Sequence, residues 1–166
     1  MGEVIARDLL TQKGLVGDVT SAGTEAVGGI EATDGAQRAV RRLGLDLAAH
    51  LSRQVTPSIV ASTDLVLAME RRHLVDLTND HDASLVCTYT IPELATLAAV
   101  TPRMRGEGTG EWLARVGDGR TPTHALQAPE IEDPTGRSLR KHRATAATIA
   151  ECLSRILDAY GAGSGR

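Results

Sequence analysis

The feature that most constrains the fold of this chain is an unbroken apolar run at Leu65–Met69, which lies between Asp64 and Glu70. A strand that is apolar at every position is typical of a sheet covered on both faces, since a half-exposed strand alternates polar and apolar residues. Segments with helical periodicity come before and after this run. Strands that alternate with helices at such spacing predict βαβ units and a parallel sheet, and therefore an α/β fold.

Two further short runs, at 19–22 and 85–88, also have the character of strands. Helices are indicated by apolar residues spaced for one face and by start and stop residues. An example is the second helix, with Thr33 or Asp34 before it and Gly44 after it. The helical segments are expected at about 4–13, 33–43, 70–77, 91–99, 111–114 and 138–160, with a short helix that starts at Pro57.

The chain begins in a helix that no strand precedes, and three strands make a narrow sheet for so many helices. One interpretation is a strand that the pattern does not reveal, and the other is a strand upstream of Met1. Residues 102–122 differ from the rest, with glycine, proline and mixed charge around Trp112. We expect them to form a variable surface excursion that holds one short helix, within a single domain over 1–166.

Composition and charge exclude several classes of function. The 18 basic and 21 acidic side chains give a net charge of −3 with no basic block, which disfavours nucleic-acid binding. No apolar run is long enough to span a bilayer and no secretory pattern opens the chain, so we expect a cytoplasmic protein without membrane association. Cys87, Cys152 and five scattered histidines lack metal-ligand spacing, so neither a metal nor a cofactor is expected.

Four segments resemble the motifs of one family, and they occur in the same order along the chain. They are Ser21–Thr24 (SAGT), His50–Thr56 (HLSRQVT), Asp64–Met69 (DLVLAM) and Ile131–Pro134 (IEDP). Each motif alone recurs by chance in many proteins, but four in order make a coincidence improbable. The chain is therefore similar to the low-molecular-weight protein tyrosine phosphatases. The resemblance implies a three-layer fold, with a parallel sheet flanked by helices.

The resemblance also implies hydrolysis of phosphomonoesters, phosphotyrosine in proteins above all. In this family a C-x5-R-[ST] loop between the first strand and the first helix holds the phosphate with backbone N–H groups and the arginine. Its cysteine thiolate attacks phosphorus. Neither cysteine of this chain fits the motif, because the sixth residue after Cys87 is Glu93 and the sixth after Cys152 is Asp158.

The opening residues indicate where the absent loop belongs. Met1–Ala6 (MGEVIA) resembles the start of the family's first helix, which follows the catalytic loop. We therefore expect the first strand and the loop to be missing from the N-terminus, and the 166-residue chain to be inactive. Removing an internal strand leaves buried backbone groups unpaired at about 1–3 kcal/mol each, against a total stability of about 5–15 kcal/mol. This favours a gene product that starts upstream over a truncated descendant.

Within the 166 residues, the resemblance assigns general acid and base catalysis to Asp133, the aspartate of the family's Asp-Pro turn. It assigns substrate binding to Ser21, His50, Arg53 and Thr135. Structural explanations compete: Asp133 initiates a turn and Ser21 ends a strand. His50 and Arg53 are equally a structural histidine and a solvated arginine. Thr135 stands where the family usually has an aromatic residue and cannot stack on a phenyl ring, which weakens the case for phosphotyrosine.

Two classes of function remain open. The first is a phosphatase whose intact form acts on a phosphorylated protein or a small phosphomonoester. The second is a non-catalytic pseudophosphatase or truncated remnant that acts as a binding module. Arsenate reduction, which occurs on the same fold, is a weaker third hypothesis. Such enzymes use additional cysteines on a mobile segment, whereas Cys87 and Cys152 lie far apart in the sequence.

Overall fold

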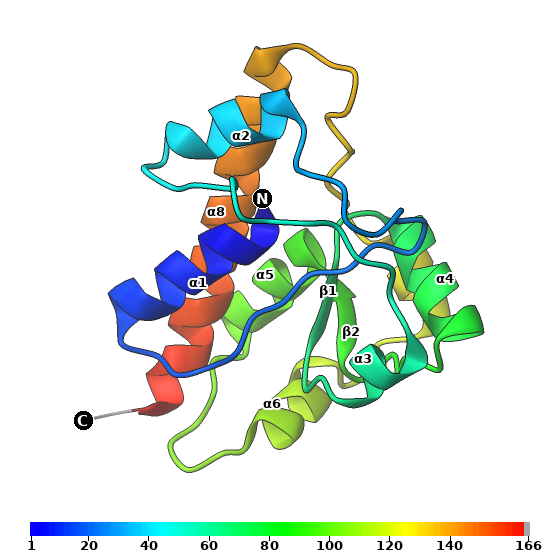
Figure 1. Cartoon of the computed structure of the whole chain (residues 1–166). Helices are drawn as coiled ribbons and strands as arrows, with labels where there is room; N and C mark the ends of the chain where they lie inside the picture. Colours follow the sequence, from blue (N-terminus) through cyan, green and yellow to red (C-terminus); the bar gives the residue numbers. More distant parts are fainter. Residues whose placement is uncertain (165–166) are drawn as a thin grey trace.

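The computed structural model of the chain (Figure 1) describes residues 1–164. In chain order its elements are α1 (Gly2–Lys13), α2 (Asp34–Arg41), α3 (Pro57–Ala61), β1 (Val66–Ala68), α4 (Arg71–Asp80), β2 (Thr88–Thr90), α5 (Ile91–Val100), α6 (Thr109–Val116), α7 (Pro122–Gln127), α8 (Leu139–Gly161) and the 3-10 turn η1 (Ala162–Ser164). The two strands lie between α1, α5 and α8 on one side and α3 and α4 on the other (Figure 1).

The two strands form a parallel pair in which Val66 lies opposite Thr88. Successive side chains of a strand point to opposite faces, and both faces of β1 are covered. Leu65 and Leu67 pack against an apolar cluster built mainly from α1, α5, α6 and α8. Val66 and Ala68 pack in a second cluster that includes residues of α3, α4 and α7. The predicted α/β class is confirmed, with helices on both sides of a small parallel sheet.

Most predicted helices are present in the structure. The residues that start and end them act over only a few positions, so the sequence alone reveals them. Gly14 ends α1 in the left-handed conformation (φ +63°), which glycine adopts without a steric penalty. The Thr33 side chain accepts a hydrogen bond from the Ala36 N–H at the start of α2. Thr56 caps α3 in the same way, directly before Pro57. The long C-terminal helix agrees with the predicted bounds to within about a residue.

One predicted strand is absent. Residues 19–22 form no strand in the structure. The Arg7 side chain instead donates two hydrogen bonds to the Val19 carbonyl, and Arg53 Nε donates to the Ser21 carbonyl at 2.8 Å. A strand needs a backbone neighbour to satisfy its N–H and C=O groups. For this segment, two arginine side chains supply part of that hydrogen bonding.

The strand predicted at 85–88 is displaced toward the C-terminus. Residues 85–87 form a turn in which the Cys87 N–H donates to the Ser84 carbonyl, and the strand starts at Thr88. Helix α7 is absent from the predicted helices, although Thr121 and Pro122 are N-cap and first-turn signals that could have revealed it.

Strand β1 carries backbone hydrogen bonds to β2 along one edge. The Val66 N–H donates to the Cys87 carbonyl at 2.8 Å, so the next residue, Leu67, directs its own N–H and C=O away from β2. Within residues 1–164, neither of these Leu67 groups makes a hydrogen bond. This edge of β1 is therefore open in the described part of the chain.

The segment at 102–122 contributes to the core as well as to the surface. Trp112 on α6 is fully buried, and its indole N–H donates to the Thr101 carbonyl at 2.8 Å. Its ring meets Tyr160 edge-on, with ring centroids 5.4 Å apart. The short helix expected around Trp112 is thus present. Among residues 1–164, no helix is both long and apolar enough to cross a bilayer.

Candidate functional site

Asp133 lies in an exposed turn at the carboxyl end of β1. The Ile131 N–H donates to the Met69 carbonyl at 2.8 Å, which holds this turn beside the end of the strand. The Asp133 N–H donates to Glu70 Oε1 at 3.1 Å, and Asp133 Oδ1 accepts from the Thr135 N–H at 2.9 Å. Oδ2 makes no hydrogen bond with any residue from 1 to 164. One carboxylate oxygen is thereby fixed by the turn and the other is available to a ligand.

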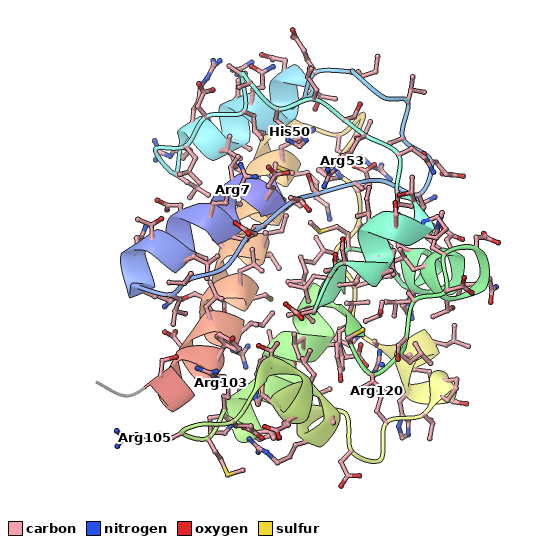
Figure 2. The ribbon with its side chains drawn as sticks, turned by 60° about the horizontal axis from the view of Figure 1, so that its bottom comes forward. Arg7, His50, Arg53, Arg103, Arg105 and Arg120 are labelled. Carbon is pink, nitrogen blue, oxygen red and sulfur yellow. The ribbon has the colours of Figure 1, made fainter. Side chains whose placement is uncertain are left out.

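Other predicted site residues line a cavity of about 390 Å³ at the first turns of α1. Ser21, His50 and Arg53 all contribute to its wall, together with Glu3 and Arg7 from α1. Figure 2 shows the two arginines and the histidine at the same end of the molecule. These three cationic or titratable side chains come from two segments, α1 and the loop before α3, that are far apart in the sequence.

Glu3 is the residue that connects this group. Its Oε2 accepts a hydrogen bond from Ser21 Oγ at 2.6 Å and lies 3.6 Å from His50 Nδ1. Its Oε1 lies 2.9 Å from Arg7 Nη2. The side chain is only 13% exposed, so the carboxylate is directed into the cavity wall. Arg53 makes no contact with Glu3 of this kind. Its Nε donates a hydrogen bond to the Ser21 carbonyl, so the position of Arg53 depends on the segment around Ser21.

Thr135 is not part of this cavity. It follows Asp133 in the exposed turn, where its N–H serves the Asp133 carboxylate. The binding roles of Ser21, His50, Arg53 and Thr135 and the catalytic role of Asp133 stay predictions. Sequence reasoning missed Glu3 and Arg7, although an acidic residue in the first turn of α1 followed four residues later by a base is a recognisable signal.

Charged contacts connect the Asp133 turn to the loop that follows Ser21. Glu70 accepts from the Asp133 N–H through one oxygen and pairs with Arg72 Nε through the other at 2.8 Å. Arg72 Nη1 then reaches Glu25 at 3.3 Å. The hydrogen bond with Glu70, with its charge, raises the pKa of Arg72, which stays protonated. The two groups of predicted residues therefore belong to adjoining loops.

The start of α1 adds positive potential to the cavity. Met1 occupies the N-cap position without a side-chain hydrogen bond to the helix. The N–H groups of a helix N-terminus carry a partial positive charge and attract anions. Burial lowers the pKa of the Met1 amino group, and the Glu3 carboxylate opposes this shift. The uncapped helix end, Arg7 and Arg53 thus lie in the same cavity wall as the carboxylates of Glu3 and Asp46.

Neither cysteine lies at this end of the sheet. Cys87 directly precedes β2, and its carbonyl accepts a hydrogen bond from the N–H of Val66, the first residue of β1. Cys87 therefore lies at the amino end of the parallel pair. Cys152 is 8% exposed within the core, and burial raises the pKa of its thiol. A thiol of that kind is a poor nucleophile. No three His, Cys, Asp or Glu side chains within residues 1–164 are grouped to hold a metal ion.

Comparison with known proteins identifies the fold and the family. The family described as "Low molecular weight phosphotyrosine protein phosphatase" matches residues 1–93. A putative low molecular weight protein-tyrosine-phosphatase of Klebsiella pneumoniae is 35% identical over 79 residues, which are 48% of this chain and 52% of that protein. The chain thus matches about half of that relative's length. A probable phosphatase of this type from Ralstonia nicotianae, EpsP, is 28% identical over 124 residues, or 68% and 86% of the two chains.

Solved structures agree over nearly the whole chain. The low molecular weight protein tyrosine phosphatase from T. tengcongensis superposes with a TM-score of 0.73 at 20% identity, covering 96% of this chain and 88% of that one. The YwlE arginine phosphatase, solved as a mutant with a phosphorylated active-site serine, also has a TM-score of 0.73, at 23% identity over 95% and 84% of the two chains. At these identities the superpositions establish the shared fold.

Proposed function

Because this chain belongs to the low molecular weight phosphotyrosine protein phosphatase family, we propose that it forms the larger part of a phosphomonoesterase in which Asp133 is the general acid and base. One observation carries the proposal. Asp133 is exposed at the carboxyl end of β1, with Oδ1 held by its own turn and Oδ2 without a partner in residues 1–164. In open α/β sheets this is the edge at which ligands bind.

The nucleophile in this proposal comes from outside the 166 residues. No cysteine of the chain is followed by an arginine at the family spacing, and both cysteines lie away from Asp133. The open edge of β1 at Leu67 supports an additional strand beside it, since the unpaired N–H and C=O groups of a strand edge are a template for pairing with another strand. A strand and phosphate loop in that position would deliver the loop to the uncapped start of α1.

The reaction then has two steps. The thiolate of the supplied cysteine attacks phosphorus, the bond from phosphorus to the ester oxygen breaks, and Asp133 gives its proton to the departing oxygen. Asp133, now ionised, takes a proton from water as that water attacks the cysteinyl phosphate, which releases inorganic phosphate and the thiolate. Asp133 ends protonated, as it began.

The substrate in this proposal is a phosphorylated protein or a small phosphomonoester in the cytoplasm. Phosphotyrosine is the family's substrate, but no aromatic side chain is available to flank its ring. Trp112 and Tyr89 are fully buried and Tyr160 packs on Trp112, while Thr135 occupies the turn after Asp133. A non-aromatic phosphate is therefore a second candidate, and a structural neighbour is named as an arginine phosphatase.

The experiment compares the 166-residue chain with a product extended by the in-frame residues encoded upstream of Met1. The purified 166-residue chain is expected to show no turnover of p-nitrophenyl phosphate. The extended product should hydrolyse it, and Asp133→Ala should slow its release of the leaving group by about 10²–10⁴-fold. Asp118→Ala, which removes an exposed carboxylate elsewhere, is the matched control.

Three results would count against this function. Turnover by the 166-residue chain that is lost in Asp133→Ala would disprove the need for an external nucleophile. An unchanged rate in the extended Asp133→Ala variant would remove Asp133 from the mechanism. A stop codon directly upstream, with no C-x5-R segment in frame, would favour the alternative of a non-catalytic binding module. Arsenate reduction is the weaker alternative and predicts activity that depends on Cys87 and Cys152.

A further inference from the structure

Two carboxylates join the turn that carries Asp133 to the start of α4. Glu70, directly before α4, accepts a hydrogen bond from the Asp133 N–H at 3.1 Å. Glu130, on the side of the turn, accepts a hydrogen bond from the backbone N–H of Arg71 at 2.9 Å. Each segment thus binds a backbone N–H group of the other. Because hydrogen bonds from N–H groups to a carboxylate are among the stronger ones, the two contacts fix the path of the main chain at Asp133.

The contact made by Glu130 holds the start of this turn. Arg71 donates from Nε and Nη2 to the two oxygens of Glu130, and these hydrogen bonds lower the pKa of Glu130. An arginine that binds both oxygens of a carboxylate also fixes its orientation. Glu130 therefore anchors the chain three residues before Asp133, and the contact with Asp133 itself is left to Glu70.

Glu70 is itself held on both sides. Its Oε2 accepts a hydrogen bond from Arg72 Nε at 2.8 Å, while Oε1 faces the Asp133 N–H. The Glu70 side chain is only 19% exposed. Arg72 continues to Glu25 at 3.3 Å, but both of these side chains are more than half exposed, so this second pair contributes little. With both oxygens engaged, the Glu70 carboxylate is a fixed acceptor for Asp133.

These contacts determine where the free carboxylate oxygen of Asp133 lies. Glu70 holds the backbone N–H of Asp133, and the Thr135 N–H donates to Asp133 Oδ1 at 2.9 Å. Since the main chain and one carboxylate oxygen are both held, Oδ2 is left with one direction. A general acid must lie within hydrogen-bond reach of the leaving oxygen, and a displacement of about 1 Å can cost about 10²-fold in rate.

We propose that Glu70 is the positioning residue of the general acid, and that it sets the direction of Asp133 Oδ2 through the Asp133 N–H. This inference rests on the proposed phosphatase function and adds to it a residue that the sequence motifs did not single out. Glu70 touches no substrate in this role. Its loss therefore affects the transfer of a proton to the leaving oxygen and leaves the binding of phosphate unchanged.

The test uses the product extended upstream of Met1 and measures kcat/KM for phenyl phosphate and p-nitrophenyl phosphate. Phenolate is a much poorer leaving group than p-nitrophenolate, so its departure depends more strongly on a general acid. Glu70→Ala should lower kcat/KM about tenfold for phenyl phosphate and less than about threefold for p-nitrophenyl phosphate. The inhibition constant of inorganic phosphate should stay the same, whereas a general loss of structure would raise it.

Two further variants separate the hydrogen bond from the charge of Glu70 and from its place as the N-cap residue of α4. Glu70→Gln removes the charge and keeps an acceptor oxygen for the Asp133 N–H, so it should retain most of the activity. Glu132→Gln removes a neighbouring carboxylate that is 73% exposed and pairs with Lys141, and it should change neither rate. In the 166-residue chain, the Asp133 amide should exchange faster with solvent in Glu70→Ala than in Glu70→Gln.

A double-variant cycle decides whether Glu70 acts through Asp133. Adding Glu70→Ala to Asp133→Ala should cause no further loss of kcat/KM for phenyl phosphate. A further loss, equal slowing of the two substrates, or an equal effect of Glu70→Ala and Glu70→Gln overturns the inference and leaves the role of Asp133 intact. No turnover by the extended product, or an unchanged rate in Asp133→Ala, overturns the proposed function and the role of Glu70 with it.

Discussion

The part of the molecule built on α5, α6 and α8 differs from the loops at 15–32 and 45–56 in what holds it in place. In the first part, which we call the packed half, Trp112 and Leu94 are fully buried in one apolar cluster. In the second, the loop half, Val16 is 97% exposed and Val27 71% exposed. Leu47 and Val55 of the loop half are buried, so apolar burial anchors this half at only a few positions.

Directed hydrogen bonds also hold the loop half in place. Arg7 and Arg53 donate to carbonyls of the segment at 19–21. The Ser52 backbone N–H donates to the Ile30 carbonyl, and its hydroxyl donates to the Val27 carbonyl. Such bonds fix geometry but contribute about 0.5–1.5 kcal/mol each, so the loop half depends on few contacts. Three of the four residues predicted to bind substrate, Ser21, His50 and Arg53, lie in this half, where small changes in contacts can move them.

The largest expected effect tests the packed half. Trp112→Ala should lower the free energy of unfolding by about 3–5 kcal/mol, because it removes a fully buried ring and leaves a cavity. Urea denaturation followed by far-UV circular dichroism measures the change. Val16→Ala, at an almost fully exposed position, is the control and should be near neutral. A loss below about 1 kcal/mol for Trp112→Ala would contradict the distinction between the two halves.

The next effect concerns a buried ion pair in the packed half. Arg120 Nε and Nη2 bind the two oxygens of Glu93 at 2.6 and 2.9 Å, and both side chains are below 10% exposed. Arg120→Ala leaves the Glu93 carboxylate buried and unpaired, which should cost about 3 kcal/mol. The double variant Glu93→Gln/Arg120→Met should recover much of this loss in the same denaturation experiment. Arg105→Ala is the exposed control.

If the double variant is no more stable than Arg120→Ala, the loss does not come from the uncompensated carboxylate. In that case the stacking of the guanidinium on Tyr89, 4.3 Å from the ring centroid, and its bond to the Leu85 carbonyl are the stabilising contacts.

A smaller effect tests the loop half. Arg53→Gln removes a charged donor from the Ser21 carbonyl and should lower the global stability by only about 1 kcal/mol. Amide hydrogen exchange in the segment at 19–25 should rise clearly, while exchange in α8 stays the same. Equal acceleration in both regions would show that the two halves unfold as one unit.

The smallest effect is a dependence on pH within the packed half. Hydrogen bonds from Arg115 lower the pKa of Glu107 from 4.5 to about 2. A carboxylate with a depressed pKa in the folded state stabilises the fold above its unfolded pKa, and this contribution is lost as the pH falls from about 5 to about 2. Glu107→Gln should therefore lose less stability over that interval than the unchanged chain does. Glu151→Gln is the control, and urea midpoints at several pH values are the measurement.

Helix positions and the course of β1 could be predicted from local signals. Thr33, Thr56 and Gly14 each act within a few residues, and the apolar run at 65–69 indicated a doubly covered strand. The sequence wrongly predicted a strand at 19–22. Whether a segment forms a strand depends on a neighbouring strand, which the local sequence does not contain.

The candidate site shows the same limit. The family motifs predicted Ser21, His50 and Arg53 as site residues, and in the structure all three line one cavity. Glu3 contacts both Ser21 and His50, but the sequence did not reveal it as a site residue, because these partners are 18 and 47 residues away. A cavity of about 300 Å³ that includes Gly35 and His142 in its wall could not be predicted either, since it lies between the N-terminal ends of α2 and α8, which meet only in three dimensions.

By itself, the sequence determined where helices start and stop, that β1 is covered on both faces, and that no C-x5-R loop lies within the 166 residues. These properties depend on neighbours along the chain or on simple counting. Only the tertiary structure decided that arginine side chains donate hydrogen bonds to the segment at 19–21, that one edge of β1 is open within residues 1–164, and that Gly35 lies against His142. Each of these depends on groups brought together by folding, and hydrogen bonding and packing act over distances in space rather than along the chain.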